Sequence, residues 1–181
     1  MGRMLVTDHF VFVHMPKTGG GFLRAAIVQS MDAKHCGSHI SYREVPAEYS
    51  ALPAICFMRN PWDWYVSLWA FQRREGSDET FSDLLSRAFA RTPDLYSLLF
   101  RRIGGIEGWR DGRVEVGRFE HLREDFVAFL DRHDIELPRL REFVLTAEPI
   151  NTSERDDYRS YYDDESRELV GRSRLARHYE F

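Results

Sequence analysis

The sequence predicts an α/β fold, with helices on both sides of a central parallel sheet in a three-layer α/β/α arrangement. Two apolar runs, residues 10–13 and 54–58, have the length and composition of buried strands. Each run is followed by a turn-forming segment and then by a helical pattern, the order that joins parallel strands through helices. We expect these two strands to be neighbours, with ligands bound at their carboxyl ends.

Further elements follow from apolar periodicity and from residues that start or stop helices. A third strand is expected at residues 114–119, and the polar segment 32–49 is expected to be irregular. Asn60 before Pro61, Thr80, and Asp163 or Asp164 are suited to begin helices. The expected helices span residues 22–31, 62–74, 81–90, 94–102, 124–133 and 164–178.

Length and composition indicate one globular domain spanning residues 1–181. The formal net charge of −4 gives no global basic field for nucleic acid, so any anion site must be local. No apolar run approaches the roughly 20 residues needed to cross a bilayer, and no signal peptide is visible. Cys36 and Cys56 form no disulfide framework, and Cys56 is expected in the core. A cytoplasmic protein with no membrane or nucleic-acid partner is therefore expected.

The clearest chemical signal lies between the first strand and its helix. Pro16 ends the strand, and three consecutive glycines let the backbone approach a ligand closely. The helix N-terminus that follows offers free N–H groups and a positive dipole end, which favours an anion. An ordinary glycine-rich turn is the alternative interpretation. The residues expected to bind the anion are Pro16, Lys17, Thr18, Gly19, Gly20, Gly21 and Phe22.

The lysine in this loop is unusual for the chain. Of the 25 Lys and Arg residues, only Lys17 and Lys34 are lysine. A compact, rotatable ammonium suits a bridging oxygen better than a planar guanidinium does. Lys17 and Thr18 precede the glycines, whereas a Walker A motif places lysine after them. His14, just before the loop, is expected to have a structural role.

A second anion site is predicted after the strand at residues 54–58. The strand ends in Arg59, whose guanidinium can hold a phosphate with two hydrogen bonds. Ser67 lies about two turns into the following helix. A nucleotide kinase would usually place an acidic residue at such a strand end to hold magnesium, so Arg59 argues against that class. A structural arginine at the sheet edge is the alternative.

Together the two motifs resemble those of sulfotransferases that use 3′-phosphoadenosine-5′-phosphosulfate (PAPS). Pro-Lys-Thr-Gly-Gly after a strand is similar to the family's 5′-phosphosulfate loop. Arg-Asn-Pro followed by Ser67 is similar to its 3′-phosphate motif. Residues 118–122 are similar to the family's strand-to-helix junction, usually written Tyr-Glu-Asp-Leu. Residues 151–153 and 158–162 resemble the C-terminal segment of carbohydrate-type members.

The resemblance implies a P-loop-kinase-like fold and the transfer of a sulfuryl group from PAPS to an acceptor hydroxyl, with a saccharide as the favoured acceptor. Lys17 would neutralise the leaving oxygen, and the loop amides would hold the phosphosulfate. Arg59 and Ser67 would hold the 3′-phosphate, and the product would be 3′-phosphoadenosine-5′-phosphate (PAP). No metal is needed in this scheme.

The chain departs from the family pattern in both motifs. Gly21 and Phe22 stand where members usually carry Thr-Ser, so two hydroxyl donors to the phosphate are missing. Trp64 stands where the second motif usually carries arginine. Donor affinity would then rest on backbone amides, Lys17 and Thr18.

The general base is expected in the polar segment after the first helix. Residues 37–42 are similar to the Gly-His-Val-Ser-Tyr-type segment of uronyl 2-O-sulfotransferases, in which the histidine is the proposed base. The resemblance assigns this role to His39, with His35 as the next candidate. Glu44 and Glu48 follow them, and an incidental polar histidine remains an alternative.

Other functional classes fit parts of the pattern. A P-loop-type kinase or NTPase would need a magnesium-binding acid at a strand end, and a PAP-binding module without catalysis would fit the missing hydroxyls. His35 and Cys36 suggest a metal site, but their spacing matches no zinc pattern, so no metal is expected. The acceptor and the oligomeric state are left open.

Overall fold

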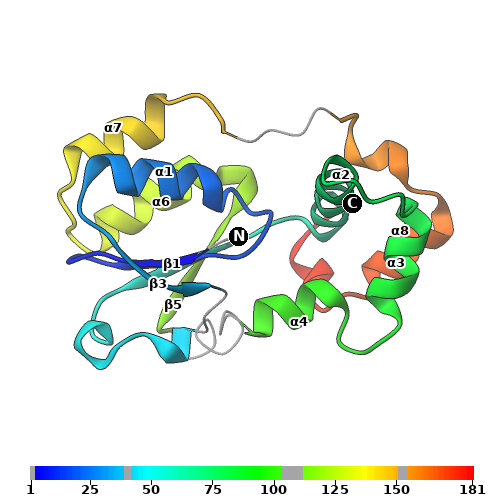
Figure 1. The fold of residues 1–181 in the computed structure, drawn as a ribbon, viewed down its shortest axis with the longest axis horizontal. Coiled ribbons are helices and arrows are strands. Elements are labelled where there is room, and N and C mark those ends of the chain that lie inside the picture. The colour runs from blue at the N-terminus through cyan, green and yellow to red at the C-terminus, as the bar shows by residue number, and fades with distance from the viewer. Residues whose placement is uncertain (1–2, 39–41, 103–111, 151–154) are drawn as a thin grey trace. The chain divides into compact units, whose positions relative to one another are not determined.

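The computed structural model describes residues 3–38, 42–102, 112–150 and 155–181 (Figure 1). The chain divides into two compact units. The first consists of Met1–Met58 and Phe100–Asn151, and the second of Arg59–Leu99 and Thr152–Phe181. Each unit is built from two stretches of chain that are separated in the sequence. The single domain expected over residues 1–181 stays a prediction.

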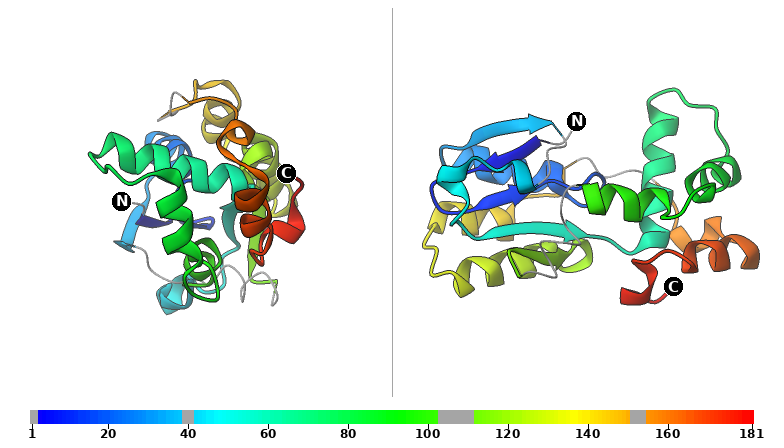
Figure 2. Two further views of the ribbon diagram at one scale, coloured as in Figure 1. Left: turned by 90° about the vertical axis from the view of Figure 1, so that its right-hand side faces the viewer. Right: turned by 90° about the horizontal axis from the view of Figure 1, so that it is seen from below.

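The first unit is built on a sheet of five strands: β1 (Arg3–Val6), β2 (Val11–Val13), β3 (Lys34–Ser38), β4 (Ala54–Met58) and β5 (Val114–Arg118). Their order across the sheet is β3-β1-β2-β4-β5 (Figure 2). β4 is parallel to both β2 and β5. The α/β class and the expected pairing of β2 with β4 are confirmed.

The two strands that the sequence analysis did not predict, β1 and β3, form the antiparallel part of the sheet. β1 runs antiparallel to both β2 and β3. A tight turn joins β1 to β2, in which Thr7 Oγ1 donates to Phe10 O and accepts from Phe10 N, both at 2.9 Å. A turn this short connects antiparallel strands, since parallel strands need a long crossover. The sheet is therefore mixed, with a parallel part formed by β2, β4 and β5.

Three helices cover one face of this sheet (Figure 1): α1 (Gly20–Ser30), α6 (Leu122–Arg132) and α7 (Pro138–Thr146). Phe10 packs edge-to-face against Phe126 and Phe129, with ring centroids 5.7 and 5.9 Å away. β4 is buried along its whole length, as expected for a central strand. Cys56 on β4 is fully buried, and burial raises the pKa of its thiol to about 12, so the thiol is part of the core as expected.

The second unit is helical in its described part. Its helices are α2 (Pro61–Arg74), α3 (Phe81–Phe89), α4 (Leu95–Arg102), which begins in this unit, and α8 (Asp164–Gly171). The predicted helix starts are confirmed. Asn60 Oδ1 accepts from Trp62 N at 3.0 Å with Pro61 at the first helical position. Thr80 and Asp163 each form a capping box at the start of their helices.

Element boundaries differ from the predictions where packing decides them. Residues 34–38, expected to be irregular, form β3 because they pair with β1. The helix α7 was not predicted, and it packs on α1. The helix expected over residues 164–178 ends at Gly171. Short 3₁₀ segments complete the chain: Tyr42–Glu44, Ala47–Tyr49, Phe119–His121, Tyr158–Tyr161 and Ala176–His178.

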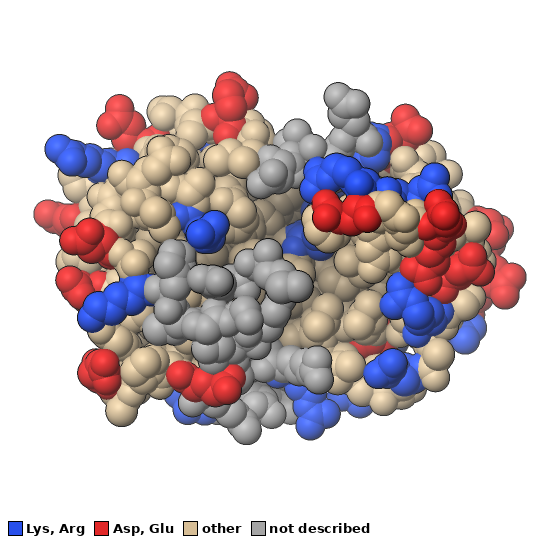
Figure 3. All heavy atoms as spheres, in the orientation of Figure 1, with Lys and Arg blue, Asp and Glu red and all other residues tan. Residues whose placement is uncertain are grey.

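The surface carries charges of both signs. Basic and acidic side chains are interspersed on the face drawn in Figure 3, in keeping with the formal net charge of −4. Within the described ranges, no helix combines the length and the apolar character that crossing a membrane requires.

Candidate functional site

The loop between β2 and α1 holds two residues in the left-handed region of backbone space. Gly19 has a φ of 76°, which glycine adopts without steric cost, but Lys17 has a φ of 64°. A residue with a Cβ in this conformation is strained by roughly 1–2 kcal/mol. Such strain persists where the surrounding structure requires the geometry, which is often at functional sites. The conformation of Lys17 therefore supports a chemical role for the loop.

Close packing shapes the same loop. A Cβ on Gly19 would lie 2.2 Å from Leu122 Cδ1, and a Cβ on Gly20 would lie 1.7 Å from Cδ2 of the His14 ring. Neither position has room for a side chain. His14 fills the space beside the start of α1, which agrees with the structural role expected for this histidine.

The hydrogen bonds of the loop separate donors used internally from donors available to an anion. Thr18 is buried, and its hydroxyl donates to Met15 O at 2.9 Å. The Phe22 N–H donates to Gly19 O at 3.0 Å. An α-helix supplies no acceptor for the N–H groups of its first residues, here Gly20 and Gly21. Since α1 has no side-chain cap and no acidic residue in its first turn, these two amides are candidate backbone donors for an anion.

Arg123 is a feature of this region that the sequence analysis missed. Its guanidinium lies over the Phe22 ring, 4.9 Å from the centroid. It also donates to Val144 O at 2.6 Å and to Ala147 O, at the C-terminal end of α7. Arg123 thereby joins α6 to α7 and holds Phe22, whose position the family pattern would give to serine.

The second predicted motif lies in the second unit, at the start of α2. The Arg59 side chain is only 9% exposed. Its Nη1 donates to Ser67 Oγ at 3.2 Å, while Nε and Nη2 contact Asp63 Oδ2 at 2.7 and 2.6 Å. The structure thus brings together Arg59 and Ser67, the pair singled out in the sequence. It adds Asp63, which lies four residues after Arg59 in the first turn of α2.

Tyr96 fixes the backbone of Arg59. Its hydroxyl accepts from Arg59 N at 2.7 Å and donates to Arg59 O at 3.0 Å. The Tyr96 ring stacks on Trp64 with centroids 4.4 Å apart and planes 12° from parallel, and both side chains are fully buried. Trp64, which departs from the family pattern, therefore supports Arg59 through Tyr96.

The C-terminal part of the chain also reaches the start of α2. Arg155 Nη2 binds Asp63 Oδ1, so one carboxylate contacts two guanidinium groups. Asn60 Nδ2 donates to Glu180 O at 2.8 Å. Arg155 and Glu180 therefore both contact the first turn of α2 and its N-cap. No local sequence pattern indicates these contacts.

The candidate bases belong to the segment that follows α1. His39 lies outside the described residues, and only the backbone of His35 is described, as part of β3. Glu44 and Glu48 lie in 3₁₀ segments and are exposed. Among the residues that the structure describes, no group of three or more His, Cys, Asp or Glu could hold a metal ion.

The fold can be compared with known proteins. No family model and no curated protein sequence matches the chain. The crystal structure of mouse sulfotransferase SULT7A1 complexed with PAP is similar, with a TM-score of 0.59 over 94% of this chain and 86% of that one. The chain has the sulfotransferase fold. The sequence identity of 17% means that the likeness shows the fold and not the activity.

Within the sulfotransferase fold, the two motifs follow neighbouring strands. The lysine loop follows β2, and Arg59 follows β4 directly. β2 and β4 pair in parallel, so their last residues, Val13 and Met58, lie at the same edge of the sheet. This is the edge at which open α/β sheets bind ligands.

Proposed function

We propose that the protein transfers a sulfuryl group from PAPS to an acceptor hydroxyl. The observation that carries the proposal is the buried pair of Arg59 and Ser67, because it places a guanidinium charge beside a hydroxyl, and this combination suits an anion that ATP lacks, the 3′-phosphate. Ser67 Oγ accepts from Arg59, so its own proton is left to donate to a phosphate oxygen. The sulfotransferase fold supports the proposal at a general level.

The loop residues supply the chemistry at the other end of the donor. The N–H groups of Gly20 and Gly21 would hold the 5′-phosphosulfate, and Lys17 would neutralise the bridging oxygen as the S–O bond breaks. In-line transfer needs donor and acceptor to be positioned and charge on the leaving group to be stabilised. The left-handed backbone conformation at Lys17 sets the direction in which its side chain leaves the loop.

The acceptor is assigned by resemblance. A saccharide hydroxyl is proposed because residues 37–42 are similar to the corresponding segment of uronyl 2-O-sulfotransferases, and His39 would remove its proton. His39→Ala should then abolish transfer while PAP binds normally. Turnover by the wild-type enzyme should rise with pH as the histidine loses its proton. Turnover of His39→Ala within a few-fold of wild type would move the base to His35, Glu44 or Glu48.

A thermal-shift panel with PAP, PAPS, ATP and AMP tests donor choice, since a ligand that binds the native state raises the melting temperature. PAP should stabilise the protein more than AMP does, because only PAP carries the 3′-phosphate. Arg59→Ala should weaken PAP binding by about 1.5–3 kcal/mol and leave AMP binding nearly unchanged. Arg87→Ala, at an exposed ion pair of the same unit, is the matched control. Equal shifts for PAP and AMP, or a larger shift with ATP and magnesium, would favour a kinase-type protein.

A PAP-binding module without catalysis is the second candidate. Two observations favour it: the Thr18 hydroxyl already donates to Met15 O, and Gly21 and Phe22 offer no hydroxyl. The two candidates are separated by incubating the protein with PAPS and a panel of saccharides. A module would bind PAP with normal affinity and form no sulfated product.

A further inference from the structure

A cavity of about 440 Å³ lies in the second unit, between the last turn of α2, the loop that follows it and α3. This volume falls within the roughly 300–1,000 Å³ that is typical of small-ligand sites. The residues that line it are separate from both anion motifs. The lining is mostly polar, and it includes Phe71, Gln72, Glu75, Ser77, Glu79 and Arg87.

Hydrogen bonds within the unit hold the wall of the cavity in place. Ser77 N donates to Gln72 O at 2.9 Å, so the loop folds back on the last turn of α2. Trp69 Nε1 donates to Glu79 O at 3.0 Å, and Thr80 then begins α3 with its capping box. The cavity is therefore formed without a ligand, which lowers the cost of ordering side chains on binding.

Two lining side chains have hydrogen-bonding capacity left for a ligand. Gln72 Oε1 is buried, and no group among the described residues bonds to it. A buried acceptor without a donor is unfavourable, and the soft terminal torsion of glutamine lets the oxygen turn toward a donor in the cavity. Ser77 Oγ accepts from Glu79 N at 3.3 Å and keeps its own proton to donate. An acceptor and a donor in one cavity suit a ligand with several hydroxyl groups.

The charges of the lining favour a neutral ligand. Arg87 donates from Nε and Nη2 to the two carboxylate oxygens of Glu79 at 2.8 and 2.7 Å, so its positive charge is balanced. Glu75 adds a carboxylate that is 61% exposed, with Arg74 Nε 3.9 Å away. An anionic ligand would therefore lose water without gaining an unbalanced positive charge from this lining, all of which the structure describes.

We propose that this cavity binds a neutral saccharide, with Gln72 accepting from one sugar hydroxyl and Ser77 donating to another. The inference goes beyond the proposed function, because it assigns a ligand to a cavity outside both anion motifs and does not depend on PAPS. The ligand also differs in charge from the uronyl unit of the enzymes that residues 37–42 resemble.

Nuclear magnetic resonance titrations of the full chain test the site, with the amide signals of residues 71–79 as the readout. The probes are the methyl glycosides of glucose, galactose and N-acetylglucosamine, with glucuronate as the anionic counterpart. At least one neutral glycoside should shift these signals and bind about fivefold or more tightly than glucuronate. Shifts with none of the neutral glycosides, or tighter binding of glucuronate, would overturn the proposal.

Gln72→Met removes the unbonded oxygen and nearly keeps the side-chain volume. It should weaken binding of the neutral glycoside by about tenfold, while the melting temperature stays equal or rises. Its PAP affinity should match that of wild type, so the result is independent of donor choice. Gln29→Met, at an exposed glutamine of α1, is the matched control and should bind the glycoside as wild type does. Unchanged glycoside binding by Gln72→Met would contradict the assigned role of Gln72 and the proposal with it.

Glu79→Gln tests the charge argument separately. It removes the carboxylate that balances Arg87, so glucuronate affinity should rise by about fivefold and the preference for the neutral glycoside should shrink or reverse. An unchanged preference would show that the balanced pair does not set the charge of the ligand, and it would overturn that part of the proposal.

Discussion

Lys17 combines a strained backbone with the charge on which the proposed transfer depends. The strain belongs to the φ of 64° and the charge to the side chain, so substitutions can separate the two. Glycine at this position removes both, whereas alanine removes the charge and keeps the strain.

Lys17→Ala should lower turnover by about 10²–10³-fold, more than it weakens PAP binding, because the ammonium is needed most as charge develops on the leaving oxygen. Lys17→Arg should not restore the rate, since a planar fork cannot occupy the same point. Steady-state kinetics with PAPS and calorimetry with PAP measure the two effects. Lys17→Gly should be equally inactive yet at least as stable as Lys17→Ala. A Lys17→Ala enzyme with wild-type turnover would contradict the mechanism.

Gly20 and Gly21 are adjacent but should respond differently to the same change. Gly20→Ala places a Cβ against the His14 ring, so it should lower the free energy of unfolding by about 1–3 kcal/mol. Gly21 is exposed in the first turn of α1, and Gly21→Ala should be neutral or stabilising by up to about 1 kcal/mol. Urea unfolding measures both variants. Equal effects would mean that His14 moves aside without cost.

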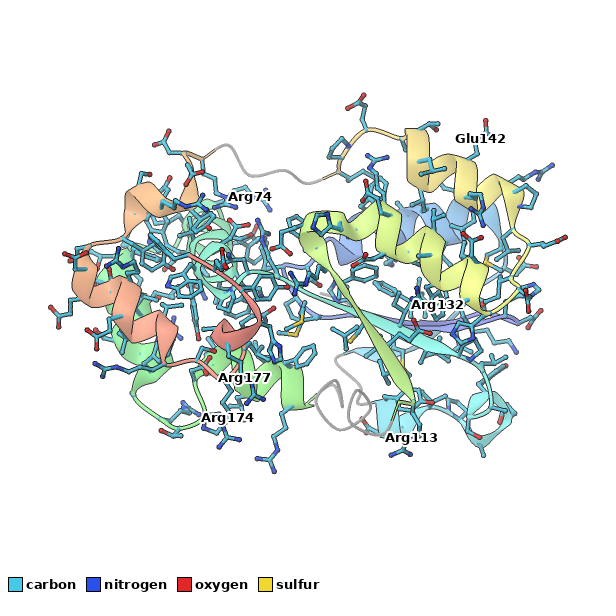
Figure 4. All side chains as sticks on the ribbon, turned by 180° about the vertical axis from the view of Figure 1, so that it is seen from behind. Arg74, Arg113, Arg132, Glu142, Arg174 and Arg177 are labelled. Atoms are coloured by element: carbon cyan, nitrogen blue, oxygen red, sulfur yellow. The ribbon has the colours of Figure 1, made fainter. Side chains whose placement is uncertain are left out.

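At the scale of elements, Glu115 joins β5 to the end of α6. Arg132, which is labelled in Figure 4, donates from Nε to Glu115 Oε2 at 3.0 Å. His133 Nε2 contacts Glu115 Oε1. Partial burial alone would raise the pKa of Glu115, but the hydrogen bonds from Arg132 and His133 outweigh it and lower the pKa below its ordinary value of 4.5. Near pH 4.5 the Glu115 carboxyl is therefore charged in a larger fraction of folded molecules than of unfolded chains.

A carboxylate with a lowered pKa stabilises the fold above its unfolded pKa, and this stabilisation is lost as the pH falls through the folded pKa. The contribution of Glu115 should thus be complete at neutral pH and disappear below pH 4.5. Glu115→Gln should be less stable than wild type at pH 7, and the difference should shrink on acidification. Denaturant unfolding between neutral and acidic pH checks this. Glu136→Gln, at an exposed carboxylate of the same unit, serves as the control, and a constant difference for Glu115→Gln would argue against the ion pair.

At the scale of the molecule, the two proposed anion motifs belong to different units, since Lys17 lies in the first and Arg59 in the second. PAP should therefore slow amide hydrogen exchange at the starts of both α1 and α2, because a bound ligand suppresses local opening. AMP should protect α1 more than α2. Exchange followed by mass spectrometry distinguishes the cases, and protection by PAP confined to one unit would contradict the division of roles.

The sequence by itself determined the features that local patterns encode. The strands at residues 10–13 and 54–58, the glycine loop, the Arg59–Ser67 spacing and the helix starts at Asn60 and Thr80 each depend on neighbours within a turn or a strand. Periodicity and capping report such contacts directly. The order of strand, loop and helix was enough to predict the α/β class and the edge at which both motifs begin.

Only the tertiary structure decided what depends on distant partners. β3 forms because β1 offers it backbone groups to pair with, and α7 packs on α1, a partner more than a hundred residues earlier in the chain. Two contacts join residues far apart in the chain. Arg155 binds Asp63, and the Tyr96 hydroxyl accepts a hydrogen bond from the backbone of Arg59. Side chains that meet only after folding leave no periodic trace in the sequence, because their spacing reflects the path of the chain and not the geometry of one element.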